Sequence, residues 1–189
     1  MENVLFINAC VRPDSRTRIL AQEVLDCLGQ PYTEVDLNRE QYPAMDRQAL
    51  ELREDLRRTE LRIHPRFAPA WQFARADIIV VAAPFWDLTF PAALRTYIEY
   101  ISANGLTYHY EADGCHGDCR AEKLAYLTSG GDLEQPESLG VLYWKQLCAM
   151  FGIPAFSYVF AGGLDLDPAK TEEILTEACE KARRLAEDF

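Results

Sequence analysis

The chain has 189 residues, of which 49% are hydrophobic and 26% charged, and this suits one globular domain with a full apolar core. Its 30 acidic and 19 basic side chains give a net charge of −11 at pH 7, which argues against a nucleic-acid partner or an anionic membrane surface. No apolar run approaches the roughly 20 residues of a membrane span, and the first residues lack the basic segment of a signal peptide, so we expect a cytoplasmic protein whose six cysteines are reduced thiols.

The first part of the chain alternates short apolar runs with a helical pattern. Residues 3–8 (NVLFIN) predict a central strand. Residues 18–28 carry apolar side chains at helical spacing, and Gly29 is expected to cap this helix. Residues 32–37 predict a second strand, which lies beside the first and parallel to it because such crossover connections are right-handed.

Residues 38–66 are the least regular part of the chain. Within them, the charge-rich stretch 46–59 predicts a helix. An excursion of this length could be a lid, a dimer surface or an insertion exposed to solvent, and its charge pattern is mostly that of a solvated helix face.

The stretch 77–110 contains the clearest functional signal. Residues 78–81 (IIVV) are β-branched throughout and predict a strand buried on both faces. The loop 85–90 then holds three aromatic residues where a solvated loop would be polar, and Pro91 begins a helix that extends to about residue 103. Ligands of open α/β sheets bind at this edge, so we expect a binding site here, although the aromatic residues could simply cover the end of the sheet.

The remaining elements complete a doubly wound sheet. Further helices are predicted at 67–76, 139–150 and 168–187, and the fourth and fifth strands at 124–128 and 153–160. Residues 104–120 are expected to be irregular. The fold class is therefore α/β, with three layers around a five-stranded parallel sheet in the order 2-1-3-4-5, formed by a single domain over residues 1–189.

The loop 9–17 has the features of a phosphate cradle. Its hydroxyls and the basic side chains in and beside it come from Ser15, Thr17, Arg12, Arg16 and Arg18. The backbone N–H groups at the start of the following helix add partial positive charge. Neither Gly-Lys-Ser/Thr nor GxGxxG occurs, so the loop suits a mononucleotide phosphate. Ser15 or Asp14 could instead serve only as the helix cap.

Four short motifs follow one another along nearly the whole chain. They are Asp14-Ser15-Arg16-Thr17, then Ala83-Pro84-Phe85-Trp86-Asp87-Leu88 with Pro91-Ala92-Ala93-Leu94-Arg95, then Gly105-Leu106-Thr107-Tyr108 with Tyr110, and finally Thr128-Ser129-Gly130-Gly131. Together they resemble the flavodoxin-like NAD(P)H-dependent FMN oxidoreductases, the family that contains FMN-dependent azoreductases and quinone reductases.

The resemblance implies a flavodoxin-like fold and an FMN cofactor. The residues that would hold the FMN 5′-phosphate are Ser15, Arg16 and Thr17. Those that would wrap the isoalloxazine ring are Pro84, Phe85, Trp86, Asp87 and Leu88, and those that would line its other edge are Thr128, Ser129, Gly130 and Gly131. NADH or NADPH would supply hydride, and a quinone-like, azo or similar small acceptor would take two electrons. Such enzymes are usually homodimers with the active site at the subunit interface.

No catalytic side chain is predicted, because a flavin itself carries the redox step. Backbone N–H groups at Gly130 and Gly131 could stabilise the negative charge that reduction builds on the ring. Stacking of Trp86 or Phe85 on the ring is a hypothesis, and packing in the core is a comparable alternative for both.

Two other classes of function stay open. A flavodoxin-type electron carrier would hold FMN without NAD(P)H activity, although the 38–66 excursion and the segment with Tyr108 and Tyr110 are suited to cover a substrate pocket. A non-enzymatic module that retains the fold is the third class, because Ala9 stands where relatives often carry a serine.

Cys115 and Cys119 flank His116 in a CxxxC pattern. The pattern suggests a metal site or a redox pair, with Cys10 and His109 as further candidates by spacing. A structural zinc needs about four ligands, so we favour an exposed loop with two inert thiols and predict no metal.

Overall fold

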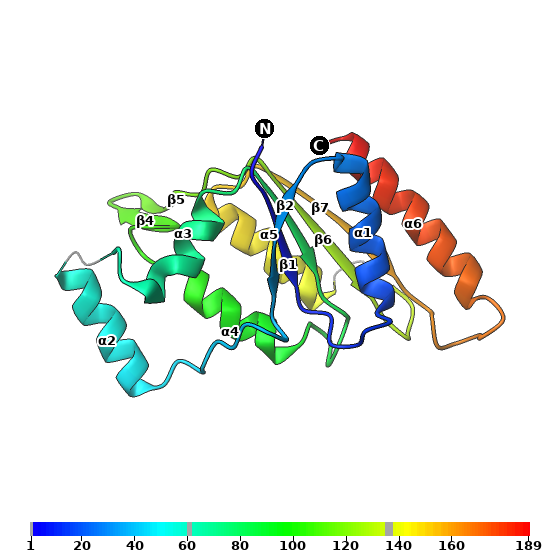
Figure 1. Cartoon of the computed structure of the whole chain (residues 1–189), viewed down its shortest axis with the longest axis horizontal. Helices are drawn as coiled ribbons and strands as arrows, with labels where there is room; N and C mark the ends of the chain where they lie inside the picture. Colours follow the sequence, from blue (N-terminus) through cyan, green and yellow to red (C-terminus); the bar gives the residue numbers. More distant parts are fainter. Residues whose placement is uncertain (1, 60–61, 135–137) are drawn as a thin grey trace.

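Five parallel strands form the central sheet of the computed structural model, which describes residues 2–59, 62–134 and 138–189 (Figure 1). The strands are β1 (Val4–Asn8), β2 (Tyr32–Asp36), β3 (Ile78–Ala82), β6 (Lys123–Ser129) and β7 (Ala155–Ala161). Their order is β2-β1-β3-β6-β7. Since β6 and β7 are the fourth and fifth strands of this sheet, the predicted order 2-1-3-4-5 is confirmed.

Helices cover both faces of the sheet. One layer contains α1 (Arg16–Leu28) and α6 (Thr171–Glu187), and the other contains α3 (Ala68–Ala74), α4 (Ala92–Ile101) and α5 (Leu139–Phe151). Successive strand side chains point to opposite faces, so Val4 and Phe6 pack with α1 and α6 whereas Leu5 and Ile7 pack in the other layer. Among the described residues, no helix is both long and apolar enough to cross a bilayer.

Capping residues set the bounds of α1. The Ser15 hydroxyl accepts a hydrogen bond from the Arg18 N–H at 3.4 Å, and the helix therefore starts two residues before the predicted 18–28. Gly29 ends it in the left-handed conformation, with φ of 60° and its N–H bonded to the Leu25 carbonyl. The predicted cap at Gly29 is confirmed, because glycine adopts this conformation without a Cβ penalty.

The segment between β2 and β3 contains α2 (Arg47–Arg58), which lies apart from the sheet (Figure 1). Asp46 caps it by accepting from the Ala49 N–H at 2.7 Å. Of the α2 side chains only Leu56 is buried, so the predicted solvated helix at 46–59 is confirmed. A short 3-10 turn, η1 (Pro65–Phe67), follows it.

The expectation of an irregular segment at 104–120 was wrong. β4 (Tyr108–Glu111) and β5 (Gly114–Gly117) pair there as an antiparallel hairpin. Four-residue strands with a glycine at either end of β5 carry too little apolar alternation to predict a strand. Gly117 is required by packing, because a Cβ there would overlap the backbone of Phe151 and Gly152.

The two ends of the described chain meet at the amino-terminal edge of the sheet (Figure 1). Glu2 and Phe189 line the same surface hollow, together with Asp77 and Lys123 at the start of neighbouring strands. The loops at the carboxyl ends of the strands lie at the opposite edge.

Candidate functional site

A hollow of about 240 Å³ opens where the loops after β1, β3 and β6 converge. Hydrogen bonds join these loops, including one from the Phe85 N–H to the Ser129 carbonyl at 2.8 Å. Nine of the twelve residues predicted for the site line the hollow, namely Ser15, Arg16, Thr17, Pro84, Phe85, Trp86, Ser129, Gly130 and Gly131.

The hydroxyls of the first loop have defined structural roles. Ser15 is the N-cap of α1 and lies beside the first turn, whose N–H groups carry partial positive charge. Thr17 is fully buried, and its Oγ1 lies 2.6 Å from the Ser129 Oγ. The pair therefore joins the loop after β1 to the loop after β6.

Asp165, which was not predicted from the sequence, holds Arg16 at the mouth of the hollow. The Arg16 Nη1 lies 3.0 Å from the Asp165 Oδ1, and both side chains are well exposed. Asp165 and Leu164 belong to the loop after β7 and line the hollow as well. The signal that could have found them is topological, because β7 ends at the same edge as the other strands.

The aromatic loop divides its side chains between the hollow and the core. Phe85 packs edge-to-face on Phe160, with ring centroids 5.2 Å apart, while Trp86 is 40% exposed at the mouth. Asp87 and Leu88 do not line the hollow. Both have left-handed backbone angles, with φ of 48° and 69°, a conformation that is strained for residues with a Cβ and that recurs at functional sites.

Two consecutive glycines bring the backbone against the hollow. A Cβ on Gly130 would lie 3.2 Å from the rings of Phe85 and Phe160, and one on Gly131 would lie 2.5 Å from the Asp165 Oδ2. The two glycines thus let the rings of Phe85 and Phe160 and the side chain of Asp165 lie close against the backbone of this wall. Thr128, near the end of β6, is instead buried and does not line the hollow.

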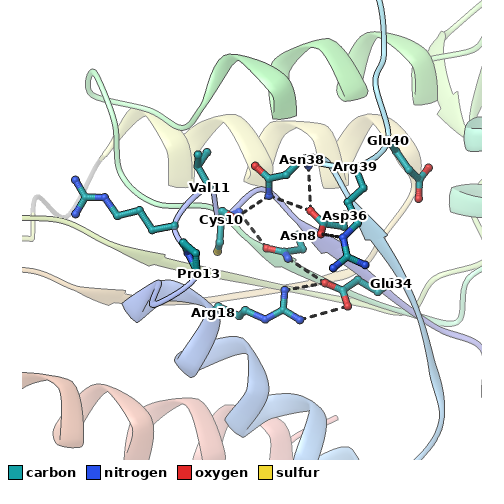
Figure 2. Close-up of a pocket in the computed structure, with 11 residues that line it drawn as sticks. Asn8, Cys10, Val11, Pro13, Arg18, Glu34, Asp36, Asn38, Arg39 and Glu40 are labelled. Carbon is teal, nitrogen blue, oxygen red and sulfur yellow. Dashed lines mark hydrogen bonds and ion pairs between the residues drawn. The ribbon is translucent and has the colours of Figure 1, made fainter.

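A second, larger hollow of about 600 Å³ lies between the ends of β1 and β2 (Figure 2). The buried Asn8 amide donates to the Glu34 carboxylate at 2.9 Å, and Arg18 pairs with the same carboxylate at 2.9 Å. The Asn38 amide donates to the Cys10 carbonyl at 2.8 Å. The polar side chains of this larger hollow are thus largely paired with one another. None of the twelve residues predicted to hold FMN lines it, although Arg12 and Arg18 of the predicted phosphate cradle do. The smaller hollow is the better candidate, and Arg12 lines both.

The thiols singled out in the sequence do not form a cluster. Cys115 is exposed on the hairpin, whereas Cys119 is half-buried and its thiol lies 3.6 Å from the Thr107 carbonyl. Burial raises the pKa of the Cys119 thiol to about 12 and that of the Cys10 thiol to about 11. Both stay neutral near pH 7, and within the described residues all six cysteines are free.

Comparisons with known proteins agree with this fold and this set of loops. The family described as "Flavodoxin-like fold" matches residues 2–186. The chain is 32% identical to the FMN-dependent NADH:quinone oxidoreductase of Clostridium beijerinckii and 33% identical to FMN-dependent NADH:quinone oxidoreductase 2 of Clostridium acetobutylicum, with 100% of both chains covered in each case. The crystal structure of an azoreductase from Bacillus anthracis strain Sterne matches with a TM-score of 0.87 and 27% identity over 100% of both chains. The resemblance seen in the four motifs is confirmed: this protein belongs to the flavodoxin-like family and is a relative of the FMN-dependent NADH:quinone oxidoreductases.

Proposed function

We propose that the protein is an FMN-dependent NAD(P)H oxidoreductase that transfers two electrons to a quinone-like, azo or similar small acceptor, with residues 1–189 as a single FMN-binding domain. The observation that carries the proposal is the convergence of a capped helix start, an aromatic loop and a glycine pair on one hollow. The names of its relatives support the same reaction.

The residues of the hollow fit an FMN molecule by their chemistry. Ser15, Arg16 and the N–H groups of the first turn of α1 would bind the 5′-phosphate, since a helix start favours an anion. Pro84 and Trp86 would contact the isoalloxazine ring on one side. Gly130 and Gly131 would approach it from the other with backbone groups alone. The hollow, with Arg16 at its mouth, has the donors that this cofactor requires.

The bound flavin would supply hydride chemistry, and the chain would orient it. N–H groups at Gly130 and Gly131 would face the part of the ring where negative charge builds, so that charge is stabilised without a protonated side chain. Trp86 at the mouth would leave one ring face open to the nicotinamide and then to the acceptor. No side chain is assigned as a general acid or base.

A homodimer is part of the proposal. Apolar side chains are exposed beside the hollow, at Trp86 and Leu88 on the loop and at Leu139 and Leu142 on α5. The two elements are neighbours, because Tyr143 of α5 packs on Phe90 with ring centroids 5.6 Å apart. An apolar patch of this kind suits a protein interface. We also propose the cytoplasm as the compartment, and six free thiols suit a reducing environment.

The phosphate assignment is tested by replacing Ser15 with two residues that cap helices equally well. Ser15→Asn keeps a neutral cap, whereas Ser15→Asp places a negative charge beside the phosphate. We expect similar urea stabilities, but FMN affinity at least about tenfold weaker for the aspartate variant, because two like charges near 4 Å repel by ~1–4 kcal/mol. Flavin fluorescence titration measures this. Equal affinity in the two variants would remove the phosphate from this loop.

The flavodoxin-type carrier is the alternative, and one spectrum separates it from the enzyme. Anaerobic addition of NADH or NADPH to the FMN-loaded protein should bleach the flavin absorption, and steady-state oxidation with a quinone should follow. FMN binding without bleaching would identify a carrier. A protein that takes up no FMN would favour the non-enzymatic module.

A further inference from the structure

The β4–β5 hairpin presents metal-ligating side chains on one face. His109 of β4 is directly opposite His116 of β5, and Glu111 is opposite Gly114. Because side chains alternate along a strand, His109, Glu111, His116 and then Asp118 point to the same side. Two of the three histidines in the chain are thus brought together with carboxylates.

The side chains on this face are close enough to share an ion. Ligand atoms of Glu111, Asp113 and His116 all lie within 4.8 Å of one another, and the His116 Nε2 is 2.8 Å from an Asp113 oxygen. His109 lies between Glu111 and Asp118, with its Nε2 3.1 Å from a Glu111 oxygen and its Nδ1 2.8 Å from an Asp118 oxygen. The two imidazole rings stack with centroids 5.5 Å apart.

The chemistry of this set selects a class of ion. Three carboxylates and two imidazoles gather on this exposed face, and the carboxylates attract a cation. An imidazole among the ligands favours borderline first-row divalent ions such as Zn²⁺, whereas Mg²⁺ and Ca²⁺ prefer oxygen alone. His109 holds the carboxylate of Glu111 through a hydrogen bond, and metal-ligating carboxylates are commonly held in this way by a neighbouring side chain.

We propose that Glu111, Asp113 and His116 bind a divalent first-row transition-metal ion, Zn²⁺ as the type case, with His109 as a positioning residue that holds Glu111. Water completes the coordination, since three protein ligands leave Zn²⁺ an open position. The site does not use the CxxxC thiols. Cys115 is opposite Tyr110 in the hairpin, on the other face from His116.

The site lies far from the proposed flavin hollow. Gly117 contacts Phe151 and Gly152, just before β7 starts, so the hairpin belongs to the amino-terminal edge of the sheet (Figure 1). An ion here would join the turn of the hairpin to both of its strands. It would therefore stabilise the folded chain, because an ion that binds only the native state adds to its stability.

Calorimetric titration of the untagged, full-length protein with ZnCl₂ tests the proposal. We expect one ion per chain, and an affinity at least about tenfold weaker in His116→Gln, within the usual range for a lost metal-site interaction. His64→Gln is the matched control, because His64 is exposed and caps η1 instead. It should bind Zn²⁺ as the wild type does, and so should Cys115→Ser.

Two further variants test the Zn²⁺ site. If His116→Gln does not fold by circular dichroism, Asp113→Asn replaces it with the same expected loss. His109→Gln should weaken Zn²⁺ binding less than His116→Gln, and it should also reduce the rise in unfolding temperature that Zn²⁺ causes. Absence of Zn²⁺ binding to the wild type would overturn the proposal. So would equal binding of Mg²⁺, or a loss seen in Cys115→Ser but not in His116→Gln.

Discussion

At the scale of single residues, the contact between Arg16 and Asp165 bears most directly on cofactor binding. The two side chains lie 3.0 Å apart at the mouth of the hollow, where the guanidinium would meet the FMN phosphate. The carboxylate competes for the same cation. An exposed ion pair contributes only about 0–1 kcal/mol to folding, so its main effect falls on the ligand.

Asp165→Asn should therefore strengthen FMN binding about two- to fivefold and change the free energy of unfolding by less than about 1 kcal/mol. Flavin fluorescence titration and urea unfolding measure the two quantities. Asp167→Asn is the control, because it removes one charge from the same loop but caps a local turn through the Ala169 N–H. Weaker FMN binding in Asp165→Asn alone would mean that the carboxylate itself contacts the flavin.

The sequence could predict Ser15 and Thr17 but not Asp165. A hydroxyl at the start of a helix that follows a buried strand has local signals, since capping and helical spacing are both visible nearby. The partner of Arg16 comes 149 positions later in the chain, in a loop without a motif. Only the completed sheet brings the two together. The residue types at positions 87 and 88 likewise gave no sign of the left-handed backbone that Asp87 and Leu88 adopt.

At the scale of elements, the parallel strands were predictable and the hairpin was not. A β-branched run such as 78–81 is buried on both faces, so its composition alone indicates a strand. The order of the strands followed from the alternation of strands and helices, which is typical of a doubly wound sheet. β4 and β5 lie outside that sheet, and they depend on their packing against α5 rather than on an apolar pattern of their own.

This packing predicts a large cost for a methyl group at Gly117. Its Cβ would overlap backbone atoms of Phe151 and Gly152, which cannot rotate away, so Gly117→Ala should destabilise the fold by more than about 3 kcal/mol. Gly29→Ala is the comparison, because its φ is positive but its nearest neighbours are 3.9 Å away, and it should cost only about 1–2 kcal/mol. Urea unfolding measures both. Equal losses would show that the hairpin can move away from α5.

At the scale of the whole molecule, FMN binding should be coupled to global stability. A ligand that binds only the folded chain stabilises it by about 2.7 kcal/mol at 100 times its dissociation constant. We expect the urea midpoint to rise with FMN in the wild type and in Ser15→Asn, and to rise much less in Ser15→Asp at the same FMN concentration. A midpoint that FMN leaves unchanged in the wild type would contradict binding to the native state.

The meeting of Glu2 and Phe189 in one surface hollow has a practical consequence. Both ends lie at the edge of the sheet opposite the hollow proposed for the flavin (Figure 1), so a linker fused to either end leaves on the far side. Attached to an electrode through such a linker, the protein would direct its redox centre toward the solution. Ends this close also favour circular permutation, since a short glycine-serine bridge would join them and new ends could open elsewhere on the surface.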